Sequence, residues 1–121
     1  NSSWPSRNMA LLGTLLLIFI IIHLKSFWYE MHFGDIGLDK WGNKDLHTVT
    51  IMAFKNIFYS AFYVLSMGFL GLHLYHGVES VFQTLGLNSM KYKGIINVAG
   101  KGLAIIIPLI FATIPIATYV R

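Results

Sequence analysis

The chain has 121 residues, of which 55% are hydrophobic and only 12% are charged, a composition outside the usual range for a soluble domain of this size. It contains no cysteine, which excludes disulfides, thiolate metal sites and covalent c-type haem attachment. The formal net charge is +4, but the nine Lys and Arg residues are spread between apolar blocks, so we expect no nucleic-acid partner. The composition therefore predicts an integral membrane protein.

Three long stretches carry no Asp, Glu, Lys or Arg: 8–24, 56–78 and 102–120. Each is close to the ~20 residues that an α-helix needs to cross a hydrocarbon core of about 30 Å. Isolated strands cannot span lipid, and the alternation typical of barrel strands is absent. We therefore predict one all-α transmembrane domain, 1–121, a bundle with three transmembrane helices: about 8–29, 56–83 and 99–120.

The connector between the first two spans, 30–55, carries both signs of charge and several glycines. Asp45 is a good N-cap residue and precedes an amphipathic stretch. We expect a short helix over 46–54 that lies along the membrane interface.

The third span contains Pro108 and Pro115. In water these prolines would argue against a helix, but in a membrane bundle neighbouring groups satisfy the carbonyls that each proline leaves without a partner. We expect the helix to continue through both prolines with a bend.

The second connector, 84–100, and the residue that follows it hold three lysines and no acid: Lys91, Lys93 and Lys101. Lys and Arg counts are nearly equal on the two faces of the predicted bundle, so the positive-inside rule does not decide the orientation. The shortness of this connector and its lack of acids favour a cytoplasmic position for it and for the amino-terminal end, with 30–55 and the C-terminus in the periplasm.

Three of the five histidines lie within predicted spans: His23, His73 and His76. Ionisable residues inside a membrane are costly and commonly mark a pathway or a cofactor, although an interhelical hydrogen bond is an equal alternative for any one of them. Because each helical residue rises about 1.5 Å, His23 and His73 are separated by about 15 Å along the membrane normal. If both are ligands, they belong to two stacked sites.

The surroundings of His73 favour a haem, because a flat porphyrin must approach the helix closely and glycines leave room for it. Small residues serve plain helix packing equally well. The glycines concerned are Gly68, Gly71 and Gly77.

Two alternatives without haem remain open. His73, His76 and Glu79 follow at i, i+3 and i+6, a spacing that gathers ligands for zinc or a di-iron centre on one helix stripe. Glu79 is the only acid in this part of the chain, which weakens that interpretation. A transporter subunit would want paired charges or a broken helix at the midplane.

Three segments resemble a known family: SRNMALLGTLLLIFIIIHLKSFWYE (6–30), AFYVLSMGFLGLHLYHGVESVFQTLGL (61–87) and AIIIPLIFATIP (104–115). They are similar to the cytochrome b membrane-anchor subunit of succinate dehydrogenase and fumarate reductase, in the single-subunit, di-haem form found in Bacteroidetes. That family has five transmembrane helices, with four haem-ligating histidines on the first four. The resemblance implies that this chain is the C-terminal part of such a five-helix di-haem bundle and holds its last three helices.

The resemblance also implies roles for the histidines. His23 falls at an axial ligand of the distal haem, and His73 at a ligand of the proximal haem. In the family, glycines stand at the fourth and thirteenth positions after the haem ligand of the fourth helix. Gly77 and Gly86 match these positions when they are counted from His73. His76 departs from the pattern and is expected to be a supporting residue, bonded to a haem propionate or a neighbouring helix.

The implied function is electron transport in a bacterial inner membrane, at the point where the tricarboxylic acid cycle meets the quinone pool. Two b-type haems relay electrons between a quinone, menaquinone by this resemblance, and flavoprotein and iron–sulfur subunits docked on the cytoplasmic side. The chain itself is then a non-catalytic electron-transfer subunit. The three lysines around the second connector would face those subunits or contact lipid headgroups. Candidates for the quinone site, by position alone, are Lys25, Tyr29, Glu30 and His32.

Overall fold

The computed structural model describes residues 4–86, 91 and 93–121, and for Pro5 and Ser6 the backbone only. Apart from one isolated bridge between Leu38 and Lys44, the described residues form helices, turns, bends and short irregular segments. The prediction of an all-α membrane bundle is confirmed. The elements are α1 (Trp4–Arg7), α2 (Met9–His23), the π-helix η1 (Leu24–Tyr29), α3 (Glu30–Phe33), α4 (Leu46–Lys55), α5 (Ile57–Thr84) and α6 (Lys93–Val120).

Three helical stretches in the described chain are long and apolar enough to span a membrane: Met9–Phe33, Ile57–Thr84 and Lys93–Val120. The second agrees with the prediction to within one residue at each end, and the first continues four residues beyond its predicted end. The third was predicted to start at 99 and in fact starts at Lys93, so 93–100 is helix and the connector 84–100 was drawn too long. The error arose because Lys93 was placed in the connector, whereas a lysine near a helix end extends its ammonium to the headgroups without breaking the helix.

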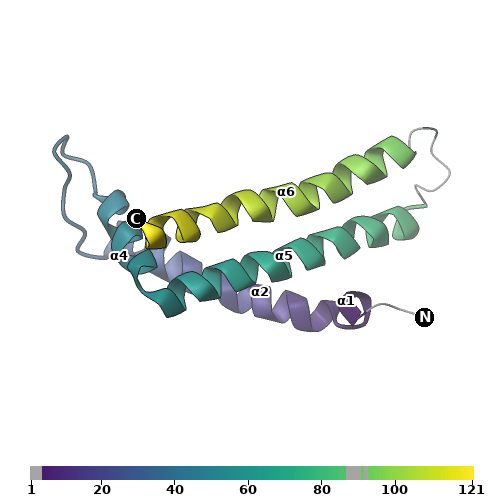
Figure 1. Ribbon diagram of the computed structural model, residues 1–121, viewed down its shortest axis with the longest axis horizontal. Helices are drawn as coiled ribbons and strands as arrows, with labels where there is room; N and C mark the ends of the chain where they lie inside the picture. The colour runs from purple at the N-terminus through teal and green to yellow at the C-terminus, as the bar shows by residue number, and fades with distance from the viewer. Residues whose placement is uncertain (1–3, 87–90, 92) are drawn as a thin grey trace.

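Helix α5 is the central element, and it packs against α2 on one side and α6 on the other (Figure 1). One end of the molecule, here called the α4 end, holds α4 and the C-terminus. The opposite end, the α1 end, holds α1, the end of α5 and the start of α6. At the α4 end, Lys55 Nζ donates to the carbonyl of Arg121 at 3.1 Å, which joins α4 to α6.

Capping side chains begin both α4 and α5. Asp45 accepts from the backbone N–H of Thr48 at 3.1 Å, which confirms the predicted cap and the short helix after it. Asn56 Oδ1 accepts from the N–H groups of Phe58 at 2.9 Å and Tyr59 at 3.3 Å. Only one residue, Asn56, separates the two helices, and its extended backbone (φ −76°, ψ 117°) turns the chain into the membrane.

Helix α6 continues through Pro108 and Pro115, both of which are buried. Pro108 lacks the N–H that would otherwise bond the carbonyl of Ala104. That carbonyl faces α5 at Gly71, where an added Cβ would lie 3.5 Å from its oxygen. Gly71 therefore lets α5 come close to the part of α6 that the proline leaves unbonded.

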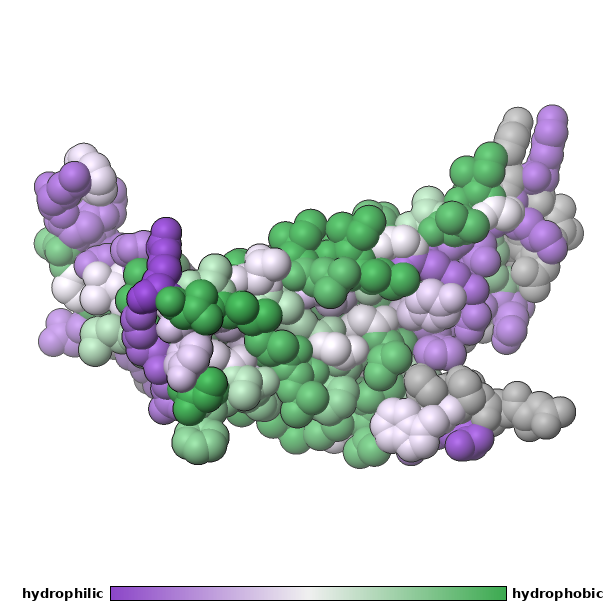
Figure 2. Space-filling model, in the orientation of Figure 1, coloured by the Kyte–Doolittle hydropathy of each residue, from purple (hydrophilic) through white to green (hydrophobic). Residues whose placement is uncertain are grey.

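Apolar side chains cover the middle of the molecule, and polar side chains gather at its two ends (Figure 2). Most large apolar side chains of the three spans are exposed, which is the arrangement that lipid or further helices require. Besides the two prolines of α6, few apolar residues of the described chain are buried: Leu12, Leu16, Phe19, Phe54, Tyr63, Met67, Phe82 and Ala104.

Candidate functional site

His23 is the last residue of α2 and lies in an aromatic cluster at the α4 end. Its Nδ1 is 3.0 Å from the hydroxyl of Tyr63 on α5. Phe19 stacks on the imidazole with ring centroids 5.7 Å apart and an interplanar angle of 21°, and Phe27 lies on its other side at 5.3 Å. No described residue bonds Nε2, so the ring is held by one nitrogen and keeps the other available.

A chain of hydroxyls continues from His23 toward the membrane surface. The Tyr63 hydroxyl is 3.1 Å from that of Tyr59, and Tyr59 donates to Oγ of Ser26. Ser26 belongs to the π-helix η1, which begins directly after His23. Such π-helical segments are rare and frequently occur at functional sites, and here one forms at the contact between the first span and α5.

His23 also lines a cavity of about 490 Å³ that lies between α2 and α6, over α5, with α4 closing one end. This volume falls within the range typical of ligand pockets, which are mainly apolar with a few polar groups. The polar side chains in the lining are His23, Thr50 and Tyr63. The remaining lining residues are apolar: Phe19, Phe27, Leu46, Phe54, Met67, Leu70, Phe111, Ile114 and Pro115.

His73 lies half-buried on α5 and faces α2. Its Cε1 would be 3.4 Å from a Cβ added to Gly13, so this glycine of α2 makes the room for the imidazole. Nδ1 of His73 is buried and has no hydrogen-bond partner in the described part of the chain. A buried polar atom without a partner is costly, especially at membrane depth, so His73 needs a partner from outside these residues.

The two imidazoles lie at different levels of the same helix pair. Gly13 meets His73, and ten residues later in α2 His23 meets Tyr63, which lies ten residues earlier in α5. Both contacts therefore belong to one antiparallel register. Ten helical residues rise about 15 Å, and His23 and His73 are separated by that distance along the helices, as the sequence predicted. A single metal ion cannot bridge them.

His76 pairs with an acid of its own helix. Its Nδ1 is 3.2 Å from Glu79 Oε2, and Glu79 Oε1 accepts from Lys101 of α6 at 2.9 Å. The partner of His76 is therefore on its own helix, and Glu79 is the residue that reaches α6; the expected bond to a haem propionate or a neighbouring helix stays a prediction. The proposed ligand stripe of His73, His76 and Glu79 is not assembled, since the described residues hold no group of three His, Cys, Asp or Glu side chains close enough to share a metal.

The glycines around His73 do not all have the expected role. Gly71 was expected to leave room for a porphyrin, but it faces Ala104 and Pro108 and serves the packing of α5 on α6. Gly68 and Gly77 have open space where a Cβ would stand. Gly86 follows the end of α5 with φ +68°, a left-handed conformation that commonly ends helices, so helix termination alone accounts for it.

Three of the four quinone-site candidates lie together. Lys25 pairs with Glu30, and its ammonium is 4.9 Å from the ring centroid of Tyr29. Lys25 and Glu30 also line a pocket of about 430 Å³. His32 contacts Trp28 instead: its Nδ1 is 2.9 Å from the Trp28 carbonyl, and its ring stacks on the Trp28 side chain at 4.6 Å.

Sequence reasoning missed Tyr63, Tyr59 and Gly13. The two tyrosines stand four residues apart in an apolar span, which places their hydroxyls on one helix face, and that spacing was the available signal. For Gly13 the sequence offered no signal, because the role of this glycine depends on which residue of α5 lies opposite.

Comparisons with protein-family models, with curated proteins and with solved structures found no match for this chain.

Proposed function

We propose that this protein is a haem b-binding electron-transfer subunit, the membrane anchor of a succinate:quinone oxidoreductase of the succinate dehydrogenase or fumarate reductase type. In this proposal His23 and His73 each supply one axial ligand to a different haem. The observation that carries it is the pair of intramembrane imidazoles, about 15 Å apart along the helices. Each has a ring nitrogen that no described residue bonds.

The surroundings of His23 fit an iron ligand. A ligating histidine commonly has its second ring nitrogen held by a hydrogen bond, which fixes the tautomer and the ring orientation. The Tyr63 hydroxyl holds Nδ1 in this way, and that leaves Nε2 for iron. The apolar cavity beside the ring is the kind of environment that a porphyrin face requires.

The surroundings of His73 fit for a different reason. Its buried Nδ1 lacks a partner, and α2 passes close to the ring at Gly13, where an added Cβ would stand 3.4 Å from Cε1. Ligation through either ring nitrogen, with the other held by a neighbouring helix, would satisfy the imidazole. The second axial ligand at each site would come from a histidine on another helix, as the resemblance implies.

A bis-imidazole haem has no open iron position and therefore carries electrons instead of binding oxygen. The contribution of this chain is to hold and orient the ligands. Tyr63 holds the His23 ring, and Phe19 and Phe27 lie against it. Burial and the hydrogen bond to the imidazole are the two means by which these residues tune a redox potential.

The remaining parts of the proposal concern sidedness and partners. The described residues at the α1 end include the cations Arg7, Lys91, Lys93 and Lys101 with the single acid Glu79, whereas the α4 end carries both signs. This balance supports a cytoplasmic α1 end, where the flavoprotein and iron–sulfur subunits would dock, in a bacterial inner membrane. The pocket of Lys25 and Glu30 is then the periplasmic candidate for binding a quinone, menaquinone by the resemblance.

A reduced-minus-oxidised optical spectrum of the intact protein, purified with its native partners, tests the proposal. A b-type α band is the expected result. A protein that is folded by circular dichroism and shows no such band would overturn the haem assignment. A bound metal without porphyrin, found in the same sample by elemental analysis, would favour a His-based metal site.

A further inference from the structure

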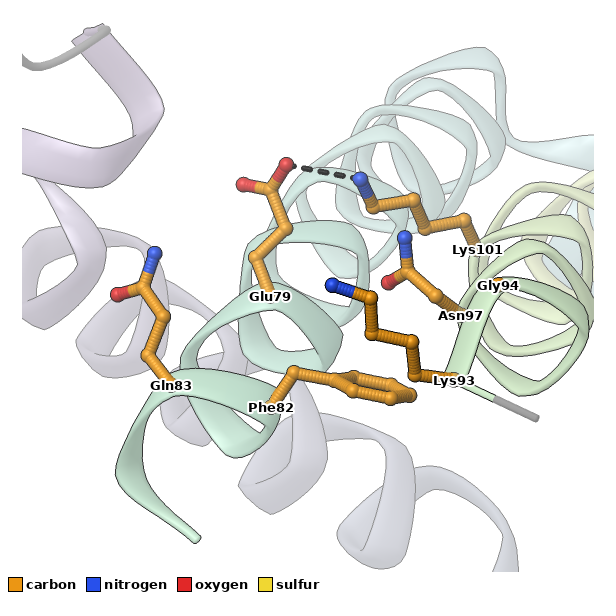
Figure 3. Close-up of a pocket in the computed structure, with 7 residues that line it drawn as sticks. All are labelled: Glu79, Phe82, Gln83, Lys93, Gly94, Asn97 and Lys101. Carbon is orange, nitrogen blue, oxygen red and sulfur yellow. Dashed lines mark hydrogen bonds and ion pairs between the residues drawn. The ribbon is translucent and has the colours of Figure 1, made fainter. Parts of the chain in front are cut away.

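Two cavities lie along the seam between α5 and α6. The first, of about 430 Å³, is mainly apolar and includes Gly68, Leu72 and Leu109 in its lining. The second, of about 310 Å³, lies toward the α1 end and is lined largely by polar side chains, among them Lys93, Asn97, Lys101 and Glu79 (Figure 3).

The two cavities follow one face of the helix pair. Residues three or four apart on a helix share a face, and the lining residues follow that spacing without interruption from one cavity to the next. On α5 the series is Gly68, Leu72, Tyr75, Glu79 and Gln83, and on α6 it is Gly94, Asn97, Lys101, Ile105, Pro108 and Ala112. The cavities therefore lie end to end.

Tyr75 and Lys101 stand where the two cavities meet. The Lys101 ammonium is 5.0 Å from the ring centroid of Tyr75 and pairs with Glu79 at 2.9 Å. An aromatic ring with a polar tip beside a lysine is typical of the level where hydrocarbon gives way to headgroups.

The length of α6 also places Lys101 at the boundary between hydrocarbon and headgroups. Its 28 residues rise about 42 Å, of which about 30 Å, or about 20 residues, cross the hydrocarbon. Counted back from Val120, a crossing of that length reaches Lys101. The apolar cavity thus lies at acyl-chain depth and the polar cavity at headgroup depth.

The polar cavity carries a surplus of positive charge. Lys101 is matched by Glu79, whereas Lys93 forms no ion pair with any described residue. Figure 3 shows the Lys93 side chain extending from α6 over the pocket toward α5, beside the Lys101–Glu79 pair. The amide of Asn97 adds a neutral hydrogen-bond donor to the lining.

We propose that this seam binds one anionic phospholipid, with an acyl chain along the cavity of Gly68 and Leu72 and the phosphate at Lys93 and Asn97. The combination argues for a lipid, because an apolar cavity that continues into a basic one matches the two parts of an anionic phospholipid, an acyl chain and a phosphate. The inference does not depend on haem binding, so either proposal stands if the other fails.

Native mass spectrometry of the purified intact complex tests this site. The probes are phosphatidylglycerol and phosphatidylcholine with identical acyl chains, added to detergent-solubilised wild type, Lys93→Gln and the control Lys40→Gln at the α4 end. One lysine at a membrane surface changes the affinity for an anionic lipid by about fivefold. We expect Lys93→Gln to lose that factor for phosphatidylglycerol only, and Lys40→Gln to match wild type.

A second pair of variants tests the acyl-chain cavity. Gly68→Phe fills it from a position with open space around the added Cβ, and we expect weaker retention of both lipids. Gly102→Phe, also open but outside both cavities, should retain them. Equal lipid retention by Lys93→Gln and wild type, unchanged retention in Gly68→Phe, or full competition by soluble glycerol phosphate would each overturn the proposal. So would a Lys93→Gln variant that keeps its lipid and loses the partner subunits, since that result assigns the lysine to an acidic protein.

Discussion

The two ends of the molecule satisfy their intramembrane histidines in opposite ways. At the α4 end, His23 bonds the neutral hydroxyl of Tyr63 inside an aromatic cluster. At the α1 end, His76 bonds the carboxylate of Glu79, which is itself paired with Lys101. The carboxylate of Glu79 lies where a lysine reaches the headgroups. In the aromatic cluster the partner of the histidine is a neutral hydroxyl, because burying a charge in lipid is costly.

His73 lies between these regions and follows neither pattern. It has no hydroxyl like that of Tyr63 and no carboxylate like that of Glu79, and its buried Nδ1 lacks a partner among the described residues. The comparison therefore separates two histidines with protein partners from one that needs a partner from elsewhere.

The largest effect on stability is expected in the α5–α6 seam of the α1 end. A Cβ at Gly100 would lie 3.1 Å from Val78 Cγ1, so Gly100→Leu must push the helices apart and should cost about 1–3 kcal/mol. Gly102→Leu, which meets open space, is the matched control. Denaturant unfolding in detergent, followed by circular dichroism, measures both, and equal losses would show that the seam is not closely packed at Gly100.

Tyr63→Phe tests the neutral network of the α4 end. It removes the hydroxyl between His23 and Tyr59 and leaves polar atoms without a partner, for a cost of about 1–2 kcal/mol. The control is Tyr119→Phe on an exposed side chain near the end of α6, which should be neutral. If the two variants have the same unfolding free energy, the hydroxyl chain does not stabilise the fold.

Asn56→Ala removes the cap at the start of α5. Two backbone N–H groups lose their acceptor, which should cost about 1 kcal/mol. Asn56→Asp keeps an acceptor oxygen and should retain most of the stability. Hydrogen exchange of the amides of Phe58 and Tyr59 provides the measurement, and unchanged protection in Asn56→Ala would refute the cap.

The smallest effect concerns the cap of α4. Hydrogen bonds from the Thr48 hydroxyl and N–H hold the pKa of Asp45 below its usual value. Because the folded-state pKa is the lower one, the stabilisation is complete above the unfolded-state pKa of about 3.9 and is lost as the pH falls through the folded-state value. Amide exchange at the start of α4 should therefore rise at acid pH relative to Asp45→Asn at the same pH. A constant ratio between the two proteins would contradict this.

Local signals in the sequence were enough for the three spans and the cap of α4. Apolar length predicts a membrane helix almost regardless of its neighbours, and Asp45 acts on a residue three positions away. The start of α6 was missed because Lys93 was read as a loop residue, although the helix accommodates it.

Contacts between helices could not be predicted in the same way. Gly71 and Gly13 have identical side chains, yet one packs against α6 and the other makes room for His73. Which helix a glycine faces depends on the rotation and register of the pair, and neither can be derived from a single span. The π-helix after His23 also carries a contact between helices, the hydrogen bond from Tyr59 to Ser26.

A redox titration followed at the b-type α band tests most directly whether His23 and His73 ligate two different haems. The samples are the intact complex and its His23→Ala, His73→Ala and His76→Ala variants, each checked for helical content by circular dichroism. We predict two haem components in wild type, the loss of a different one in each of the first two variants, and both retained in His76→Ala. Loss of the same component in His23→Ala and His73→Ala, or loss of one in His76→Ala while His73→Ala keeps both, would contradict the account.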